Sequence, residues 1–243
     1  MSGLSLDQAY RVQDSVTQKR IERGEAVVGY KVGCTSFAIQ SQLGLKEPIC
    51  GKLFAPHLYN EKADLYWNKY INCAIEPEMV LKIEKDLKGY NLPDEILIDA
   101  IKYVSLGLQI HNYKFWYTPV TSQELICANG IHAGLIVSNA KVLPQDLSFK
   151  TEIFEVLKAG RLIAAAPASE IMGGPLNSLR WLTGFLTRKR RSLEPDTFVI
   201  PGSPVELITI SEDTELTINI GEVGSITKNL GKLLLTSDIL VEY

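Results

Sequence analysis

Apolar positions in the first part of the chain follow two periodicities in turn. Ser5 with Gln8 three residues later forms a capping-box pattern, which predicts a helix that begins at Ser5 and ends at Gly24. Residues 26–32 are a valine-rich run that predicts a strand, and residues 36–43 have the spacing of a short helix.

The middle of the chain continues this alternation after an interruption. Residues 47–64 contain prolines and a glycine, so we expect a loop there. Strand-like patterns cover residues 71–83 and 106–110. Residues 94–104 follow a proline and carry apolar positions at helical spacing, which predicts a helix.

The last part of the chain is dominated by strands. Residues 121–130 have a second capping-box pattern and a glycine at the end, and residues 176–190 predict a long helix. Residues 153–165 predict a hairpin, and residues 197–241 predict strands and turns. Because strands and helices alternate early whereas the tail is all strand, we expect an α+β fold with a mixed, curled sheet in one domain, 1–243.

The composition argues against nucleic-acid binding and against a membrane-spanning protein. Among 243 residues, 25 Lys and Arg stand against 28 Asp and Glu, a net charge of −3, so no general basic field exists for nucleic acid. The 46% apolar and 22% charged residues are typical of a globular protein, and no apolar run is long enough to span a membrane. No export signal is visible at the N-terminus, so we expect a cytoplasmic protein without nucleic-acid or membrane partners.

The cysteines and histidines form no recognisable metal or redox motif. There is no CxxC, no HExxH and no paired histidine spacing, so we expect free thiols and no zinc site. Glycine-rich nucleotide motifs and the GxSxG nucleophile motif are also absent from the sequence. The residues concerned are Cys34, Cys50, Cys73, Cys127, His57, His111 and His132.

Two carboxylates interrupt an otherwise apolar strand. Glu76 and Glu78 are two residues apart, so their side chains point to one face of the strand, about 7 Å apart. Converging carboxylates repel each other unless a cation or a proton lies between them, and their oxygens suit Mg²⁺ or Mn²⁺. The alternative is the solvated face of an edge strand, where Pro77 is also tolerated.

A lysine lies inside a glycine-flanked strand pattern. Lys31 stands between Gly29 and Gly33, and small neighbours allow a ligand or a second backbone to approach. Close to a metal, such a lysine could pair with a substrate carboxylate or move a proton. The alternative is a lysine whose stem is buried and whose ammonium reaches solvent at a strand edge.

Two further segments allow more than one interpretation. The turn at residues 173–178 could present backbone N–H groups to an anion or simply begin a helix. The basic run at residues 188–191 lies where a helix dipole favours positive charge, and a nucleic-acid patch is the sharper alternative.

Several segments together resemble one enzyme family. They are VGYKVGCTS at 28–36, QSQLG at 40–44, IEPE at 75–78, GPLN at 174–177 and GEVGSI at 221–226. In this order, along residues 9–230, the chain resembles the 2-keto-4-pentenoate hydratase / 4-oxalocrotonate decarboxylase family. The resemblance implies a fumarylacetoacetase-like fold, a mixed β-sheet roll with flanking helices, assembled as oligomers.

The resemblance also implies a divalent cation, Mg²⁺ or Mn²⁺, that is chelated by a 2-hydroxy-dienoate or a 2-oxo acid. Glu76 and Glu78 match two metal-binding glutamates of the family, and its third glutamate falls on Gln109. Lys31 matches a lysine at the family's site, and Asn129 matches an asparagine that we expect to orient substrate.

This sequence departs from the family at several of those positions. Gln109 replaces a carboxylate by an amide and so removes a full negative charge, which predicts weaker metal binding. Ile49 and Ala128 stand where relatives carry acidic residues. The residues around Ile49 are closer to the decarboxylase form, whereas the GPLN turn is closer to the hydratase form.

These observations predict an enzyme, a metal-assisted lyase that hydrates a 2-hydroxy-dienoate or a related 2-oxo acid. The alternatives are a decarboxylase of a 4-oxalocrotonate-type acid, a metal-independent biosynthetic enzyme on the same scaffold, and a non-catalytic partner subunit. We expect a homo-oligomer that binds a small 2-oxo or enol acid, and a complex with a related enzyme is compatible with the sequence.

Overall fold

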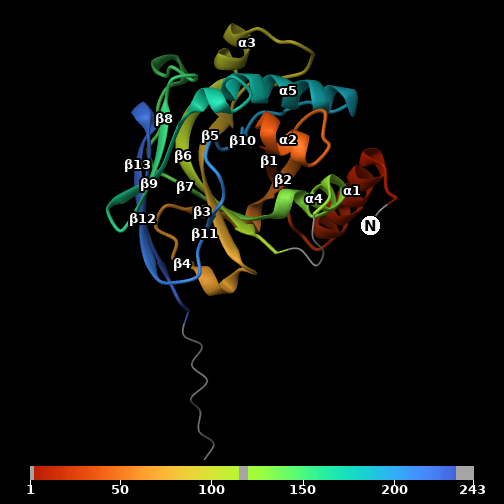
Figure 1. The fold of residues 1–243 in the computed structure, drawn as a ribbon. Coiled ribbons are helices and arrows are strands. Elements are labelled where there is room, and N and C mark those ends of the chain that lie inside the picture. Colours follow the sequence, from red (N-terminus) through yellow and green to blue (C-terminus); the bar gives the residue numbers. More distant parts are fainter. Residues whose placement is uncertain (1–2, 115–119, 234–243) are drawn as a thin grey trace, which may run out of the picture.

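Two sheets and five α-helices form the framework of the described part of the chain, residues 3–114 and 120–233 of a computed structural model (Figure 1). The helices are α1 Leu6–Glu22, α2 Phe37–Gln42, α3 Asp94–Asp99, α4 Ser122–Cys127 and α5 Pro175–Arg188. The strands are β1 Val27–Gly33, β2 Ile49–Phe54, β3 Leu58–Asn60, β4 Leu65–Tyr66, β5 Cys73–Ile83, β6 Ile101–Asn112, β7 His132–Val137, β8 Ile153–Lys158, β9 Arg161–Pro167, β10 Phe198–Ile200, β11 Ile208–Thr209, β12 Thr214–Ile220 and β13 Gly224–Gly231.

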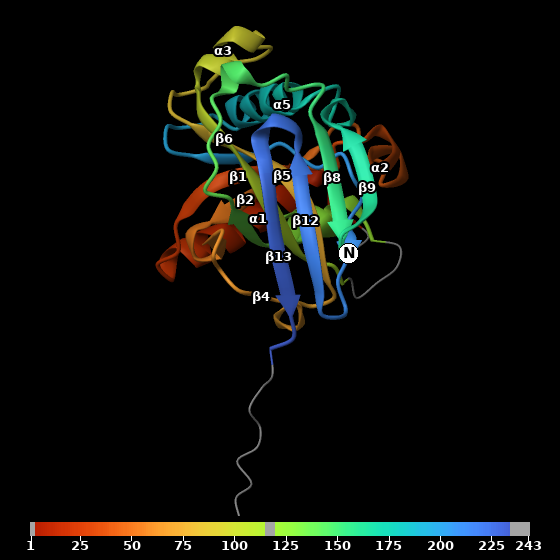
Figure 2. The same ribbon diagram turned by 90° about the vertical axis from the view of Figure 1, so that its left-hand side faces the viewer.

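The larger sheet has eight strands in the order β2-β1-β10-β5-β6-β7-β3, with β11 paired to β5. Its pairs are mostly antiparallel, but β1–β10 and β3–β7 are parallel. The smaller sheet has the order β4-β13-β12-β8-β9 and lies across β5 and β6 (Figure 2). The α+β class with mixed sheets, predicted from the sequence, is therefore confirmed.

The main core lies between the two sheets and beneath α5. Long β5 and β6 contribute side chains that are fully buried, such as Ile75, Met79 and Leu108. The smaller sheet contributes Phe154 and Ile218 to the same cluster. Each such side chain stabilises the fold by about 1.5–3 kcal/mol through burial of apolar surface, so the central strands are a rigid support for polar groups on them.

Helices α1 and α4 pack together beside β2, away from the smaller sheet (Figure 1). Both begin with the capping boxes expected from the sequence, formed by Ser5 with Gln8 and by Thr121 with Glu124. Among the described helices, none is long and apolar enough to cross a membrane.

Two expectations about secondary structure were wrong. The helix expected over residues 94–104 ends at Asp99, and Ile101 begins the twelve-residue strand β6 instead. The loop expected over residues 47–64 contains β2, every residue of which is buried. In both cases, pairing with a long neighbouring strand outweighs the local pattern. The last residues of the strand-rich tail, 234–241, lie outside the described residues.

Candidate active site

The candidate site lies where one edge of β5 has no strand partner. On that edge β10 pairs with β5 at Leu81 and β11 pairs with it at Ile75, which leaves the stretch between them unpaired. The side chains of Glu76 and Glu78 project from this stretch toward one face. The other edge of β5 is paired along its length with β6, so that Glu76 lies directly opposite Gln109.

Both carboxylates accept hydrogen bonds from elements on either side. Glu78 is 1% exposed, and its Oε2 accepts from the backbone N–H of Gly202, 3.1 Å away, just after β10. Glu76 keeps 21% of its side chain exposed, and its Oε2 lies 2.9 Å from Nε2 of His111. The pair is thus anchored, and the edge-strand alternative of two solvated glutamates does not describe Glu78.

The two carboxyl groups have opposite pKa shifts. Burial and the charge of Glu76 raise the pKa of Glu78 well above its usual value, against the smaller opposing effects of Lys31 and Gly202. Burial also favours a raised pKa for Glu76, but His111 and Lys31 together outweigh it and hold that pKa below its usual value. The raised pKa of Glu78 indicates that burial, together with the charge of Glu76, disfavours a second negative charge on this face.

Lys31 comes from β1 and is 4% exposed. Its stem passes Gly51, which lies opposite on β2, and Gly130: a Cβ at these glycines would come within 2.8 Å of Lys31 Cγ and 3.2 Å of Lys31 Cε, respectively. Its Nζ donates to the carbonyl of Gly130 at 3.0 Å. Burial lowers the pKa of Lys31, whereas Glu76 and Glu78 oppose that shift.

Gln109 joins the lysine to the buried carboxylate. The donors and acceptors around its amide are matched in one orientation. In it the oxygen accepts from Lys31 Nζ at 2.9 Å and the nitrogen donates to Glu78 Oε1 at 3.3 Å. In this orientation the oxygen is also 3.0 Å from Nδ1 of His132, which then donates to it. The structure therefore brings together Lys31, Glu76, Glu78 and Gln109, four residues singled out from the sequence.

Two histidines complete the cluster, and sequence reasoning did not place them there. His111 on β6 lies opposite His132 on β7. Burial is the main cause that lowers the pKa of both imidazoles, and Lys31 lowers both further, so both are neutral at neutral pH. His111 then donates from Nε2 to Glu76, and its buried Nδ1 has no hydrogen-bond partner within the described chain. Strand spacing could have identified His111 from the sequence, because this residue follows Gln109 by two positions and therefore shares its face of the strand.

A left-handed turn supports the lysine from the other side. Asn129, Gly130 and Ile131 have φ values of 57°, 61° and 55°, a conformation that is strained for a β-branched residue such as Ile131. The Asn129 amide does not point into the cluster. It accepts from the backbone N–H of Lys52 at 2.7 Å and donates to the carbonyl of Lys52 at 2.8 Å. In this structure Asn129 holds the turn against β2.

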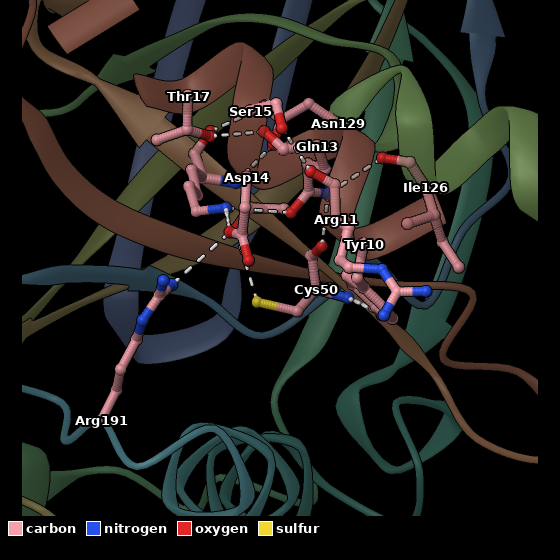
Figure 3. A network of polar contacts seen from close by, with 12 residues as sticks. Tyr10, Arg11, Gln13, Asp14, Ser15, Thr17, Cys50, Ile126, Asn129 and Arg191 are labelled. Atoms are coloured by element: carbon pink, nitrogen blue, oxygen red, sulfur yellow. Dashed lines mark hydrogen bonds and ion pairs between the residues drawn. The ribbon is translucent and has the colours of Figure 1, made fainter. Parts of the chain in front are cut away.

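On the opposite face of β2, a polar network ties α1 to the sheet (Figure 3). Lys52, which is 5% exposed, donates to Asp14 at 2.7 Å and to Gln13 at 3.1 Å. The Gln13 amide donates in turn to the carbonyls of Cys50 and Ile126, both at 3.0 Å. This network joins α1, β2 and α4 and so fixes the strand that lies beside Lys31.

The cluster fits a hard divalent cation through oxygen donors. No group of three or more His, Cys, Asp and Glu side chains suited to a metal ion exists among residues 3–114 and 120–233. Glu76 and Glu78 nevertheless supply carboxylate oxygens on one face, and one ammonium stands against these two carboxylates. The Gln109 amide shares that face, but its oxygen is occupied by Lys31 and His132 and its nitrogen faces Glu78. A divalent cation would supply the missing positive charge, and it typically keeps positions for water and substrate.

The chain is similar to several known proteins. No protein-family model matches the chain. Over 227 residues it is 24% identical to the TodF product hydratase of Pseudomonas putida F1, which covers 93% of this chain and 85% of that protein. It is also 24% identical over 218 residues to 2-keto-4-pentenoate hydratase of Paraburkholderia phymatum, covering 90% and 83%.

The fold is also similar to solved structures. The 4-oxalocrotonate decarboxylase of Pseudomonas putida G7, complexed with magnesium and adipate, matches with a TM-score of 0.89 at 21% identity. The match covers 94% of this chain and 87% of that chain. A fumarylpyruvate hydrolase from Pseudomonas aeruginosa, in complex with Mn²⁺ and pyruvate, matches with a TM-score of 0.65 at 15% identity, covering 84% and 89%. Along most of its length the chain is thus similar to members of the 2-keto-4-pentenoate hydratase / 4-oxalocrotonate decarboxylase family.

Proposed function

We propose that the protein is a metal-assisted lyase that adds water to a 2-hydroxy-dienoate or a closely related 2-oxo acid. The observation that carries the proposal is the cluster on one face of a sheet in which buried Lys31, Glu78 and Gln109 lie beside the partly exposed Glu76. The hydratases named above support the reaction class, because they match along nine tenths of the chain.

Each residue of the cluster has a proposed task. Glu76 and Glu78 would hold Mg²⁺ or Mn²⁺, and Gln109 would join them as a ligand once its amide turned its oxygen from Lys31 toward the cation. When bound, such a cation draws electron density from the oxygen at C2 of the substrate and stabilises the negative charge that develops there. Lys31 donates only to neutral acceptors, the Gly130 carbonyl and the Gln109 amide, so its positive charge is available to pair with the substrate carboxylate.

The proposed chemistry has two steps. The dienol is protonated at the end of its diene that is remote from C2, which leaves an enone, and water then adds to that enone. Nearly complete burial of Lys31 and Glu78 strengthens their electrostatic effect on the substrate, because charges interact more strongly away from water. We propose that Asn129 acts as a positioning residue: it holds the turn whose Gly130 carbonyl accepts from Lys31.

The direct test is calorimetric titration of Mg²⁺ and Mn²⁺, with and without oxalate as a mimic of the enolate. We expect binding that tightens with oxalate and is abolished in Glu76→Gln/Glu78→Gln, together with turnover of a 2-hydroxy-dienoate by the unchanged protein. Gln109→Glu, which adds a third carboxylate, should tighten Mg²⁺ binding by about tenfold or more, whereas Gln109→Met should not. Unchanged turnover and metal binding in the double glutamine variant would contradict the proposal.

A decarboxylase of a 4-oxalocrotonate-type acid is the second candidate. It is favoured by the TM-score of 0.89 with a solved decarboxylase. The same enolate would then take up the electrons left by departing CO₂. Release of CO₂ from a 2-oxo diacid, without hydration of a dienoate, would select this reaction.

The remaining alternatives differ in metal use and catalysis. The carboxylates already accept hydrogen bonds from protein groups, which is compatible with a metal-independent enzyme, and full activity in excess chelator would select it. No turnover across a panel of 2-oxo acids, together with stable association with an active relative, would select a partner subunit. Assembly as a homo-oligomer in the cytoplasm is also proposed, and light scattering checks the oligomer size.

A further inference from the structure

A hollow lies behind the candidate active site, on the opposite face of β1. It has a volume of about 410 Å³ and lies beyond the C-terminal end of α5. Tyr30 faces this cavity, whereas its neighbour Lys31 faces the buried cluster. The polar residues at its wall are Tyr30, Lys88, Arg190, Arg191, Ser192, Glu194 and Thr197.

The four basic residues at the end of α5, residues 188–191, differ in their ion-pair partners. Arg188 forms an ion pair with Glu47 at 2.8 Å, and Lys189 lies 3.8 Å from Asp7, so these two cations hold α5 against neighbouring segments. Arg190 has no acidic partner among the described residues, and it lines the cavity instead. Packing of α5 therefore does not account for all four charges.

The cavity wall carries more positive than negative charge. Lys88 and Arg190 have no ion pair in the described chain, and Arg191 has a long one, 3.5 Å to Asp14. Against these three cations the wall has one carboxylate, Glu194. Three cationic side chains thus lie around one hollow of a protein whose net charge is −3, although their mutual repulsion favours separation.

Neutral hydrogen-bond donors also line the cavity. Burial raises the pKa of Tyr30, so its hydroxyl keeps its proton and remains a donor. This hydroxyl has no hydrogen-bond partner among residues 3–114 and 120–233, and Ser192 adds a second hydroxyl to the wall. Guanidinium groups bind carboxylate and phosphate oxygens through paired N–H donors, and hydroxyl groups complete such sites.

We propose that this cavity is a binding site for a small anion with at least two negative charges, carried by phosphate or carboxylate groups. Its volume suits a ligand of the size of a small metabolite rather than a macromolecule. The site is separate from the candidate active site, and its existence does not depend on the proposed lyase reaction.

The experiment is calorimetric titration of the full chain, freed of divalent cations by chelator, at constant ionic strength. The probes are inorganic pyrophosphate and citrate. We expect one saturable site per chain, and about tenfold or greater weakening in Lys88→Gln/Arg190→Gln. The matched control is Lys102→Gln/Arg161→Gln, which removes two exposed cations that lie outside the cavity wall and should leave affinity unchanged.

The two probes also distinguish the chemistry of the ligand. Binding of pyrophosphate alone would support a phosphate ligand, binding of citrate alone a carboxylate ligand, and binding of both the shared anion chemistry. The proposal is overturned if neither probe binds, if the cavity variant keeps full affinity, or if both variants lose affinity equally.

Discussion

Two buried lysines on neighbouring strands show how the same side chain serves two purposes. Lys31 on β1 and Lys52 on β2 are 4% and 5% exposed, but they lie on opposite faces of the sheet. Lys52 donates directly to the carboxylate of Asp14. Lys31 donates to a carbonyl and an amide, and within the described chain no carboxylate lies within 4.0 Å of its Nζ.

The difference lies in how the charge is neutralised. The ion pair of Lys52 is a closed arrangement that stabilises the contact between α1 and β2, and it leaves no capacity for another anion. Lys31 is near two carboxylates but is not paired with either, so a substrate carboxylate can still become its direct partner. A buried cation without a direct counter-charge costs stability, which is why such an arrangement indicates a functional role.

The largest expected effect comes from removing each ammonium in turn. Lys31→Met should lower turnover of a 2-hydroxy-dienoate by about a thousandfold with little loss of stability. Lys52→Met should instead lower the free energy of unfolding by about 2 kcal/mol and change turnover far less, because it breaks a structural pair beside the partly exposed Asp14. Urea unfolding and steady-state kinetics on both variants check this, and equal effects on turnover would erase the distinction.

A smaller effect is expected when Lys31 is displaced but keeps its charge. In Gly51→Ala the new Cβ would come within 2.8 Å of Lys31 Cγ and 2.9 Å of the Asn129 carbonyl oxygen, so one of them must move. We expect about tenfold lower turnover and a loss of about 1–3 kcal/mol in stability.

The matched control for this variant is Gly231→Ala, where a Cβ meets no atom within 4 Å. It should keep both stability and turnover. If Gly51→Ala behaves like the control, the fit between β2 and the lysine stem is unimportant.

The smallest effect concerns the ion pair of Lys52 and its dependence on pH. Burial tends to raise the pKa of Asp14, but Lys52 and Arg191 outweigh it and hold that pKa below its usual value. The carboxylate therefore stabilises the fold fully above about pH 4 and loses this contribution as the pH falls further.

We expect Asp14→Asn to cost about 1 kcal/mol at neutral pH, since Asp14 is 41% exposed and water screens its charge. The wild-type chain should lose more stability than this variant between about pH 4 and pH 2. Urea unfolding across that range measures the difference, and two parallel curves would refute the assignment.

Local sequence signals predicted the elements whose ends carry a capping motif or a turn motif. The capping boxes at Ser5 and Thr121 fixed the starts of α1 and α4, and the hairpin of β8 and β9 followed from its turn. The wrong predictions concern β2 and the start of β6. Strand β2 is buried on both faces, so it has no alternation of polar and apolar residues, and only pairing with other strands reveals it. At the start of β6 Lys102 is exposed, and the apolar residues there also fit helical spacing, so pairing with β5 decides the structure.

The candidate site was predictable to the extent that its residues share a strand. Strand spacing placed Glu76 and Glu78 on one face, and the flanking glycines singled out Lys31. The family resemblance then assigned Lys31 to the same site and added Gln109. The link between Gln109 and His132, or the use of the Asn129 amide by the backbone of Lys52, depends on contacts across strands far apart in sequence. Whether these residues bind metal or substrate stays a prediction for the titrations above.

The alternation of side chains along β1 has a consequence for how this protein can change in evolution. Tyr30 and Lys31 serve opposite faces, and a strand has a side-chain period of two. Inserting or deleting one residue within this strand would put the tyrosine into the buried cluster and the lysine at the cavity wall. A change of length in the loops around β1 leaves this arrangement intact, whereas a shift of register at Tyr30 and Lys31 reverses it.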